Sequence, residues 1–326
     1  MSSNTKLNIA IRAEGGGGDY LLANKLVNIL KHSYPYSNFN LFCDSDGNDG
    51  PSKIISKYFG HLYNSIAICE PRKNKEYLVN TQWGRENLPA IIDNLSDNDL
   101  NKIKDNNDIF IDCWIDGLNW IDHIPDWPRY FHEWPEIDVG RSGLEMDECL
   151  RIFDMTKEPY IICHPMSRPE SNHKMGEEWY VQKLLKDLSN KFKVIVIAED
   201  KYVELSLYKN AAAIPNVRVE VLNFDEIILL SAQKNLVSFI GVDSSPRYIP
   251  KHFNKPSFVY SQYCSAPGVA AKSHIIRWLV DEQFVIPMNH NTKEVVNAIN
   301  NVKENPAAWF WPWLDDLDSR LIKRNL

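Results

Sequence analysis

Short apolar runs alternate with amphipathic stretches along most of the chain. Runs of four to seven apolar and β-branched residues between polar or turn residues are typical of buried strands, and apolar residues spaced three and four apart are typical of helices. In the first half this pattern predicts a helix at 19–31 and strands at 7–12, 38–43, 65–69 and 109–114. Strands that alternate with helices in this way indicate an α/β fold with a parallel sheet.

A second and clearer series begins after Thr156. It predicts an amphipathic helix at 177–190 with an apolar set of Trp179, Val181, Leu184, Leu185 and Leu188. It also predicts strands at 159–164, 192–198, 217–222, 236–242 and 256–260. We therefore expect two Rossmann-like domains, at 1–155 and 156–308, that face each other across a cleft, followed by an aromatic segment and helix at 309–326.

Length and composition agree with this division. The chain has 326 residues, of which 44% are hydrophobic and 24% charged, as in ordinary globular proteins of about two domains. Ten Trp residues are more than packing alone requires. Sugar or nucleobase faces are one reason to keep such rings, and packing in the core and between domains is the other.

The net charge of −7 is unevenly distributed along the chain. Residues 105–154 contain 3 Lys or Arg against 13 Asp or Glu, whereas residues 155–326 contain 21 against 19. No run of Lys or Arg occurs, and proteins that follow a phosphate backbone need a basic face. We therefore expect no nucleic-acid partner.

The N-terminal residues and the cysteines indicate in which cellular compartment the protein is expected. The first residues form no apolar signal core, and no run of about 18 apolar residues occurs, so we expect at most peripheral contact with a membrane. The six Cys are scattered without a CxxC pair, which is typical of free thiols in a reducing cytoplasm. The absence of clustered His and Cys motifs predicts no bound metal.

The first candidate site is a glycine run between a strand and a helix. Gly15, Gly16, Gly17 and Gly18 let the backbone approach a ligand, and Asp19 follows at the start of the helix. A dinucleotide fingerprint would need a further glycine at position 20, where Tyr stands. Asp19 is then either a functional acid or one that only stabilises the helix dipole.

The second and third candidates follow strands of the second half. His164 and Arg168, with Lys174 downstream, lie after the first of these strands, and the two cations suit phosphate oxygens. Alternatively, His164 has only a structural role, with its hydrogen bonds satisfied inside the fold. Asp243, Ser244 and Ser245 follow the strand at 236–242 and form either a diphosphate-binding turn or a simple helix cap.

Together these motifs resemble the ADP-heptose:lipopolysaccharide heptosyltransferase family of GT-B glycosyltransferases. The similar pattern is IRxxGGGGDxLLA, then PYIICHP with Lys174 and EEW, then GVDSS shortly before KPSFVY, in that order over residues 7–262. The resemblance implies a GT-B fold and transfer of a sugar from a nucleotide diphosphate sugar to a glycan or glycolipid hydroxyl. It implies no cofactor beyond that co-substrate.

By the same resemblance, Asp19 is the catalytic base, Lys174 binds donor phosphate, and Asp243, Ser244 and Ser245 form the diphosphate turn. The chain departs from the family where its Thr-Gly is Ser244-Ser245 and where Tyr248 replaces a histidine. These departures leave the donor nucleotide and sugar open. We predict inverting, metal-independent transfer.

The acidic, aromatic segment at 116–138 is a candidate acceptor surface. Trp114, Asp116, Trp120 and Trp127 could stack on sugar faces and bind hydroxyls, and a solvated acidic surface is the alternative. Other functions on the same pattern are a nucleotide-sugar epimerase, a noncatalytic nucleotide- or glycan-binding module, and a dinucleotide-dependent oxidoreductase with Asp44 on the ribose.

Overall fold

The computed structural model describes residues 6–13, 17–44, 51–69, 77–81, 85–90, 97–112, 133–144, 154–168, 173–242, 244–261, 284–287 and 290–304. The described residues fall into two compact units that divide between Arg141 and Ser142, here the N-terminal and the C-terminal unit. The domain boundary near residue 155 stays a prediction. The segment at 309–326 lies outside the described residues.

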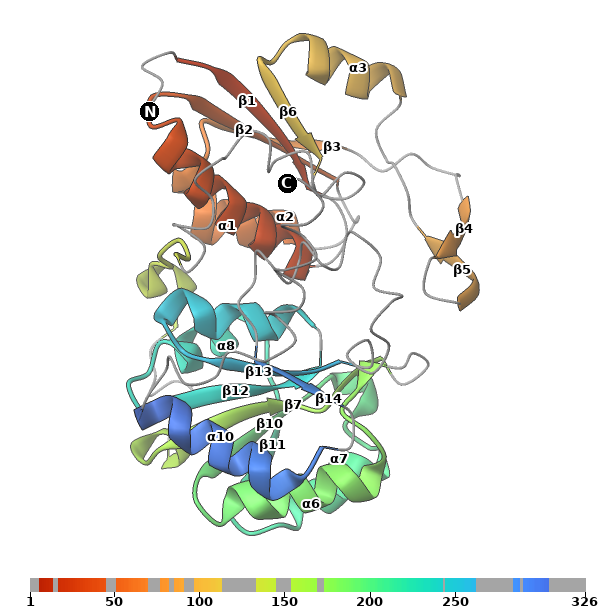
Figure 1. Ribbon diagram of the computed structural model, residues 1–326, viewed down its shortest axis with the longest axis vertical. Helices are drawn as coiled ribbons and strands as arrows, with labels where there is room; N and C mark the ends of the chain where they lie inside the picture. Colours follow the sequence, from red (N-terminus) through yellow and green to blue (C-terminus); the bar gives the residue numbers. More distant parts are fainter. Residues whose placement is uncertain are drawn as a thin grey trace, which may run out of the picture. The chain divides into compact units, whose positions relative to one another are not determined.

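The N-terminal unit is built on a parallel sheet of four strands in the order β3-β2-β1-β6 (Figure 1). The strands are β1 (Asn8–Ala13), β2 (Asn38–Asp44), β3 (Ser65–Cys69) and β6 (Ile109–Asp112). The helices are α1 (Gly17–Ser33), α2 (Pro51–Phe59), η1 (Gly60–Leu62), α3 (Asp97–Asp105) and η3 (Val139–Ser142). A separate antiparallel pair is formed by β4 (Tyr77–Thr81) and β5 (Arg85–Ala90).

Packing explains why the first βα unit forms. Ile9 and Ile11 of β1 are fully buried, as are Val27 and Leu30 of α1, so strand and helix remove apolar surface from water together. Strand order runs from β1 to β2 and β3 on one side and to β6 on the other. The order therefore reverses between β1 and β6.

The C-terminal unit has a parallel sheet of six strands in the order β11-β10-β7-β12-β13-β14 (Figure 1). The strands are β7 (Tyr160–His164), β10 (Lys193–Ala198), β11 (Val217–Val221), β12 (Leu236–Val242), β13 (Ser257–Ser261) and β14 (Phe284–Pro287). The helices are η4 (Asp154–Lys157), α6 (Glu178–Ser189), η5 (Asp200–Tyr202), α7 (Ser206–Ala212), α8 (Phe224–Ser231), η6 (Ser245–Phe253) and α10 (Thr292–Glu304). In Figure 1, α6, α7 and α10 lie on one face of this sheet and α8 on the other.

Helix α6 corrects one detail of the sequence prediction. Trp179 was expected on the apolar face, but its exposed fraction is 63%, and Tyr180 is buried in its place. Val181, Leu184 and Leu188 are buried as predicted. At 100° per residue Trp179 lies about opposite the centre of the buried face, so helical geometry directs it to solvent.

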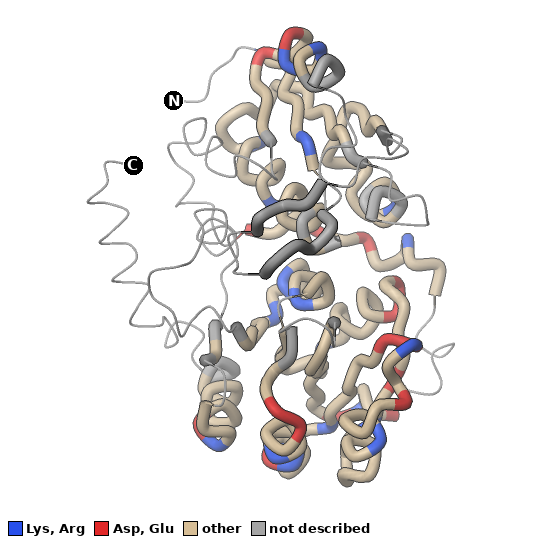
Figure 2. Tube along the Cα trace, turned by 90° about the vertical axis from the view of Figure 1, so that its right-hand side faces the viewer, with Lys and Arg blue, Asp and Glu red and all other residues tan. Residues whose placement is uncertain are grey.

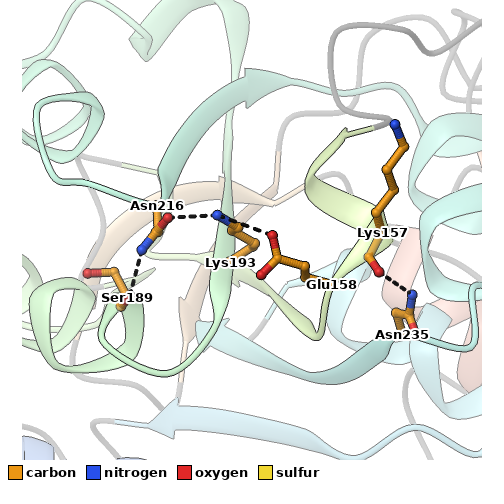
Figure 3. A network of polar contacts seen from close by, with 6 residues as sticks. All are labelled: Lys157, Glu158, Ser189, Lys193, Asn216 and Asn235. Atoms are coloured by element: carbon orange, nitrogen blue, oxygen red, sulfur yellow. Dashed lines mark hydrogen bonds and ion pairs between the residues drawn. The ribbon is translucent and has the colours of Figure 1, made fainter.

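Polar side chains close the amino-terminal edge of this sheet (Figure 3). Lys193 Nζ donates to Asn216 Oδ1 at 2.8 Å and lies 3.5 Å from Glu158 Oε1. Asn235 Nδ2 donates to the Lys157 carbonyl at 3.1 Å. Asn216 has a φ of 63°, which Asn tolerates better than most residues. These bonds hold the turns that precede β7, β10, β11 and β12.

The α/β class and the principal strands are confirmed, with ends shifted by up to two residues among the described positions. Lys and Arg as well as Asp and Glu occur along the described backbone (Figure 2), and helices α3, α6 and α10 each carry both signs of charge. In the described part of the chain, no helix is long and apolar enough to cross a membrane.

Candidate functional site

The site in the C-terminal unit lies where the strand order of its sheet reverses. From β7 the chain proceeds to β10 and β11 on one side, whereas β12, β13 and β14 lie on the other side. In parallel α/β sheets the loops after the two strands at such a point form a crevice for ligands. Here those loops begin at His164, at the end of β7, and after Val242, at the end of β12.

The structure brings two predicted donor-binding residues into direct contact at this point. His164 Nδ1 lies 2.8 Å from Ser244 Oγ, although the residues are 80 positions apart in the sequence. The His164 side chain is 3% exposed. Burial lowers the pKa of His164 to about 4, so the imidazole is neutral near pH 7.

Close packing between β7 and β12 makes this contact possible. Gly241 is paired with His164 in the strand register. A Cβ at Gly241 would stand 2.7 Å from the His164 carbonyl oxygen and 2.9 Å from the Phe239 ring. The missing side chain therefore allows the two strands to approach at their carboxyl ends.

Ser244 and Ser245 lie at the start of helix η6. Ser244 is the N-cap residue, with extended backbone, but its hydroxyl makes no capping bond. Pro246 has no N–H, and the Arg247 N–H donates to the Ser244 carbonyl at 3.2 Å. A turn of this kind presents an early backbone amide, that of Ser245, toward an anion. Asp243 lies outside the described residues.

The predicted loop after β7 proves to be a short antiparallel hairpin. Its strands are β8 (Met166–Arg168) and β9 (His173–Lys174), with Met166 opposite Lys174 and Arg168 opposite His173. The Met175 N–H donates to the Pro165 carbonyl at 2.9 Å and closes the base of the hairpin. The backbone thus returns Lys174 to the carboxyl end of β7, whereas the side chains of Arg168 and Lys174 lie outside the described part.

Arg247 is a cation of this turn to which the sequence assigned no role. Its side chain is fully buried, with the guanidinium carbon 3.9 Å from the centre of the Tyr248 ring and a hydrogen bond to the Tyr248 hydroxyl. Ser257 Oγ of β13 donates to the Arg247 carbonyl at 2.6 Å. The only feature of the sequence that points to Arg247 is its place at the end of the segment GVDSSPR.

Two tyrosines brace the same edge of the sheet further along. The hydroxyls of Tyr180, in α6, and Tyr260, in β13, are 2.6 Å apart. Tyr180 Oη also donates to the His290 carbonyl at 2.7 Å. Because a carbonyl only accepts, the shared bond must be donated by Tyr260. These bonds join the start of α6, β13 and the segment before α10.

The candidate base lies at the equivalent edge of the N-terminal unit. Asp19 is the third residue of α1, which follows β1, and Gly17 and Gly18 are the first two. The Asp19 side chain lies outside the described part, as do Gly15 and Gly16. The strand order of this unit also reverses beside β1, so the predicted strand–glycine–helix arrangement stands at a switch point.

The predicted acceptor residues Trp114, Asp116, Trp120 and Trp127 lie outside the described residues. Trp134, at the end of the same aromatic stretch, is half-buried, and Lys25 Nζ lies 4.5 Å from its ring centre. Lys25 is itself fully buried. This one Trp therefore packs against a cation within its unit.

Within the described ranges, no group of three or more His, Cys, Asp or Glu side chains could hold a metal ion. At the C-terminal switch point the described residues place the backbone of Lys174, in β9, and that of Ser245, at the start of η6. Metal independence stays a prediction.

Comparison with known proteins identifies the fold. No family model matches the sequence, and no curated protein is similar to it in sequence. The family 9 glycosyltransferase of Veillonella parvula overlaps with a TM-score of 0.55 at 9% identity, covering 93% of this chain and 99% of that one. E. coli ADP-heptose heptosyltransferase II gives 0.51 at 12% identity, covering 92% and 100%.

These likenesses confirm the GT-B type of fold that the resemblance implied. The UDP-GlcNAc 2-epimerase of Neisseria meningitidis overlaps less, with a TM-score of 0.46 at 8% identity over 93% of each chain. That value is too low to favour the epimerase alternative. At such identities the fold is shared, and activity has to be inferred from residues of this chain.

Proposed function

We propose that the protein is a glycosyltransferase that moves a sugar from a nucleotide diphosphate sugar to a hydroxyl of a glycan or glycolipid. The observation that supports this most is the His164–Ser244 contact at the switch point of the C-terminal sheet, with Lys174 in the adjoining hairpin. The fold shared with glycosyltransferases is the second support.

In this proposal the C-terminal unit binds the donor. Lys174, helped by Arg168, neutralises phosphate oxygens, and the Ser244–Ser245 turn together with Asp243 holds the diphosphate and a sugar hydroxyl. Fixed cations and backbone amides stabilise the nucleoside diphosphate as the glycosidic bond breaks. No divalent ion is then needed for the leaving group.

Asp19 is the proposed base of the N-terminal unit. It takes the proton from the acceptor hydroxyl as that oxygen attacks the anomeric carbon, and the nucleoside diphosphate leaves from the opposite face with inversion. One C–O bond forms as another breaks, and the proton ends on the carboxylate. The glycines before Asp19 let acceptor and donor approach the backbone closely.

The acceptor is proposed to be neutral and rich in hydroxyls. Residues 105–154 contain ten more acidic than basic residues, and this density of charge disfavours a phosphorylated glycan. Trp114, Trp120, Trp127 and Asp116 are the proposed contacts. Preferential binding of a phosphorylated oligosaccharide would overturn this assignment.

The test is a transfer assay with the full chain. A nucleotide sugar that binds is incubated with a panel of neutral glycans and glycolipids, and released nucleoside diphosphate and elongated product are both measured. Asp19→Asn should lower kcat by about a hundredfold or more, the usual scale for loss of a general base, with donor affinity unchanged. Asp97→Asn, which removes an acid from the first turn of α3, is the matched control and should retain turnover.

Normal turnover by Asp19→Asn would remove Asp19 from the role of base. Incubation with the donor alone separates the alternatives. Conversion to an epimeric sugar would indicate an epimerase, and binding without any conversion, with or without acceptor, would indicate a binding module.

A further inference from the structure

The hydroxyl of Ser244 takes part in two polar contacts. Ser244 Oγ lies 2.8 Å from His164 Nδ1 and donates to the Val242 carbonyl at 3.3 Å. A carbonyl oxygen can only accept, and a serine hydroxyl has one proton to give. With the proton directed to Val242, Ser244 Oγ is left to accept from His164 Nδ1.

The tautomer of His164 follows from this assignment. Nδ1 has to bear the proton, and since the buried ring is neutral, Nε2 does not bear one. The low pKa of His164, caused by burial, agrees with a ring that stays uncharged above pH 5. His164 is thus a fixed donor in a pair whose other member, Ser244, has a movable proton.

The bond from Ser244 to Val242 is the weaker of the two. At 3.3 Å it is longer than the 2.5–3.0 Å of ordinary O–H···O bonds, whereas the 2.8 Å bond from His164 is of normal length. A hydroxyl bound to a phosphate oxygen would be shorter and roughly twice as strong as a neutral bond. An anion at this turn can therefore take the proton away from Val242.

Ser244 also does not make the hydrogen bond that is usual for a serine at an N-cap. A serine at an N-cap normally accepts from an amide of the first turn, but Ser244 Oγ makes no such bond in η6. Ser244 Oγ instead accepts the hydrogen bond from His164 Nδ1. The hydroxyl proton is then held only by the long bond to the Val242 carbonyl.

We propose that His164 is a positioning residue that acts through Ser244: its Nδ1–H holds Ser244 Oγ while the hydroxyl proton swings from the Val242 carbonyl to a phosphate oxygen of the donor. The inference rests on the proposed function and changes the role of His164, which acts on the donor through Ser244 rather than by direct contact. No covalent bond changes, and the proton remains on Ser244 throughout.

The tautomer is tested on the wild-type protein, so it does not depend on the folding of a variant. Two-bond ¹⁵N–¹H correlation spectra distinguish a protonated Nδ1 from a protonated Nε2, and the His164 signals are assigned by their loss in His164→Asn. The expected result at pH 7 is a protonated Nδ1 and a bare Nε2. A proton on Nε2, alone or on both nitrogens, would overturn the proposal.

The coupling is tested with inorganic pyrophosphate as the probe, by titration calorimetry of the full chain. Ser244→Ala should weaken binding roughly tenfold to a hundredfold, the range for a hydrogen bond to a charged group. His164→Phe should weaken it similarly, but it should have almost no further effect when Ser244 is already Ala. His164→Asn keeps an N–H near the place of Nδ1 and should restore most of the affinity.

Two results would contradict the positioning role. One is that His164→Phe lowers the pyrophosphate affinity equally in the wild-type and in the Ser244→Ala background. That result would indicate a direct or purely structural effect of the His164 ring. The other is no loss at all in a folded His164→Phe. If wild-type protein binds neither pyrophosphate nor any nucleoside diphosphate, the proposed function fails first and this inference falls with it.

Discussion

Gly241 lies opposite His164 across β12 and β7, so close that a Cβ at Gly241 would stand 2.7 Å from the His164 carbonyl oxygen. Real Cβ contacts are essentially never under 3.0 Å, and the atom in the way is backbone in the middle of a sheet. Gly241→Ala must therefore push the two strands apart at the edge where His164 meets Ser244. We expect a loss of about 1–3 kcal/mol in the free energy of unfolding, the usual cost of overpacking, together with weaker pyrophosphate binding.

The matched control is Gly60→Ala. A Cβ at Gly60 would meet nothing within 4 Å, so the same methyl group has room there. Chemical denaturation of both variants gives the comparison. Equal stability of Gly241→Ala and wild type would contradict the close approach of β7 and β12.

The buried neutral His164 predicts a pH dependence of stability. Its pKa is about 4 in the folded chain and near 6.5 when unfolded, so the unfolded state binds more protons between these values. Stability from this residue is complete above pH 6.5 and is lost as the pH falls toward 4, by about 3 kcal/mol in all. Denaturation midpoints should thus fall less steeply for His164→Asn over this range than for wild type, and an identical slope would show that His164 is not held neutral.

Tyr180→Phe is expected to loosen the bracing of the sheet edge. The change removes the acceptor of the Tyr260 hydroxyl and the donor to the His290 carbonyl, and the Tyr260 hydroxyl is buried. Leaving a buried polar group without a partner costs about 1–3 kcal/mol. Tyr36→Phe, at a side chain 62% exposed, is the control and should be neutral in the same denaturation experiment.

Lys174→Ala is expected to weaken binding of a nucleoside diphosphate by about tenfold or more, because a charged hydrogen bond contributes about 1.5–3 kcal/mol. Lys183→Ala removes the same charge from the exposed side of α6 and should leave affinity unchanged. Titration calorimetry of both variants provides the measurement. An unchanged dissociation constant for Lys174→Ala would remove it from the donor site.

The sequence predicted the sheets well because long apolar runs such as 236–242 have no other stable place than a buried strand. The hairpin after β7 could not be predicted, since its strands have three and two residues and leave no periodic pattern. Trp179 was misplaced because a large apolar residue next to a true core position, Tyr180, looks like part of the same face.

Single residues of the candidate site can be predicted from the sequence, but the contacts between them cannot. The sequence marks His164 and Ser244 as residues that follow strand ends, but their bond depends on two strands, β7 and β12, that are separated by four others in the chain. Only the strand order makes β7 and β12 neighbours. Arg247 cannot be predicted in this way, because nothing in the sequence indicates that its charged side chain is fully buried.

The central claim is that the turn at Ser244 and the hairpin at Lys174 bind a nucleoside diphosphate. The most direct measurement is thermal unfolding of the full chain with ADP, GDP, UDP and CMP and with their linked sugars. We predict that at least one nucleoside diphosphate raises the melting temperature in a concentration-dependent manner, because a ligand that binds only the folded state stabilises it. We also predict that Lys174→Ala diminishes this rise. No rise with any of these ligands at millimolar concentration would contradict the claim.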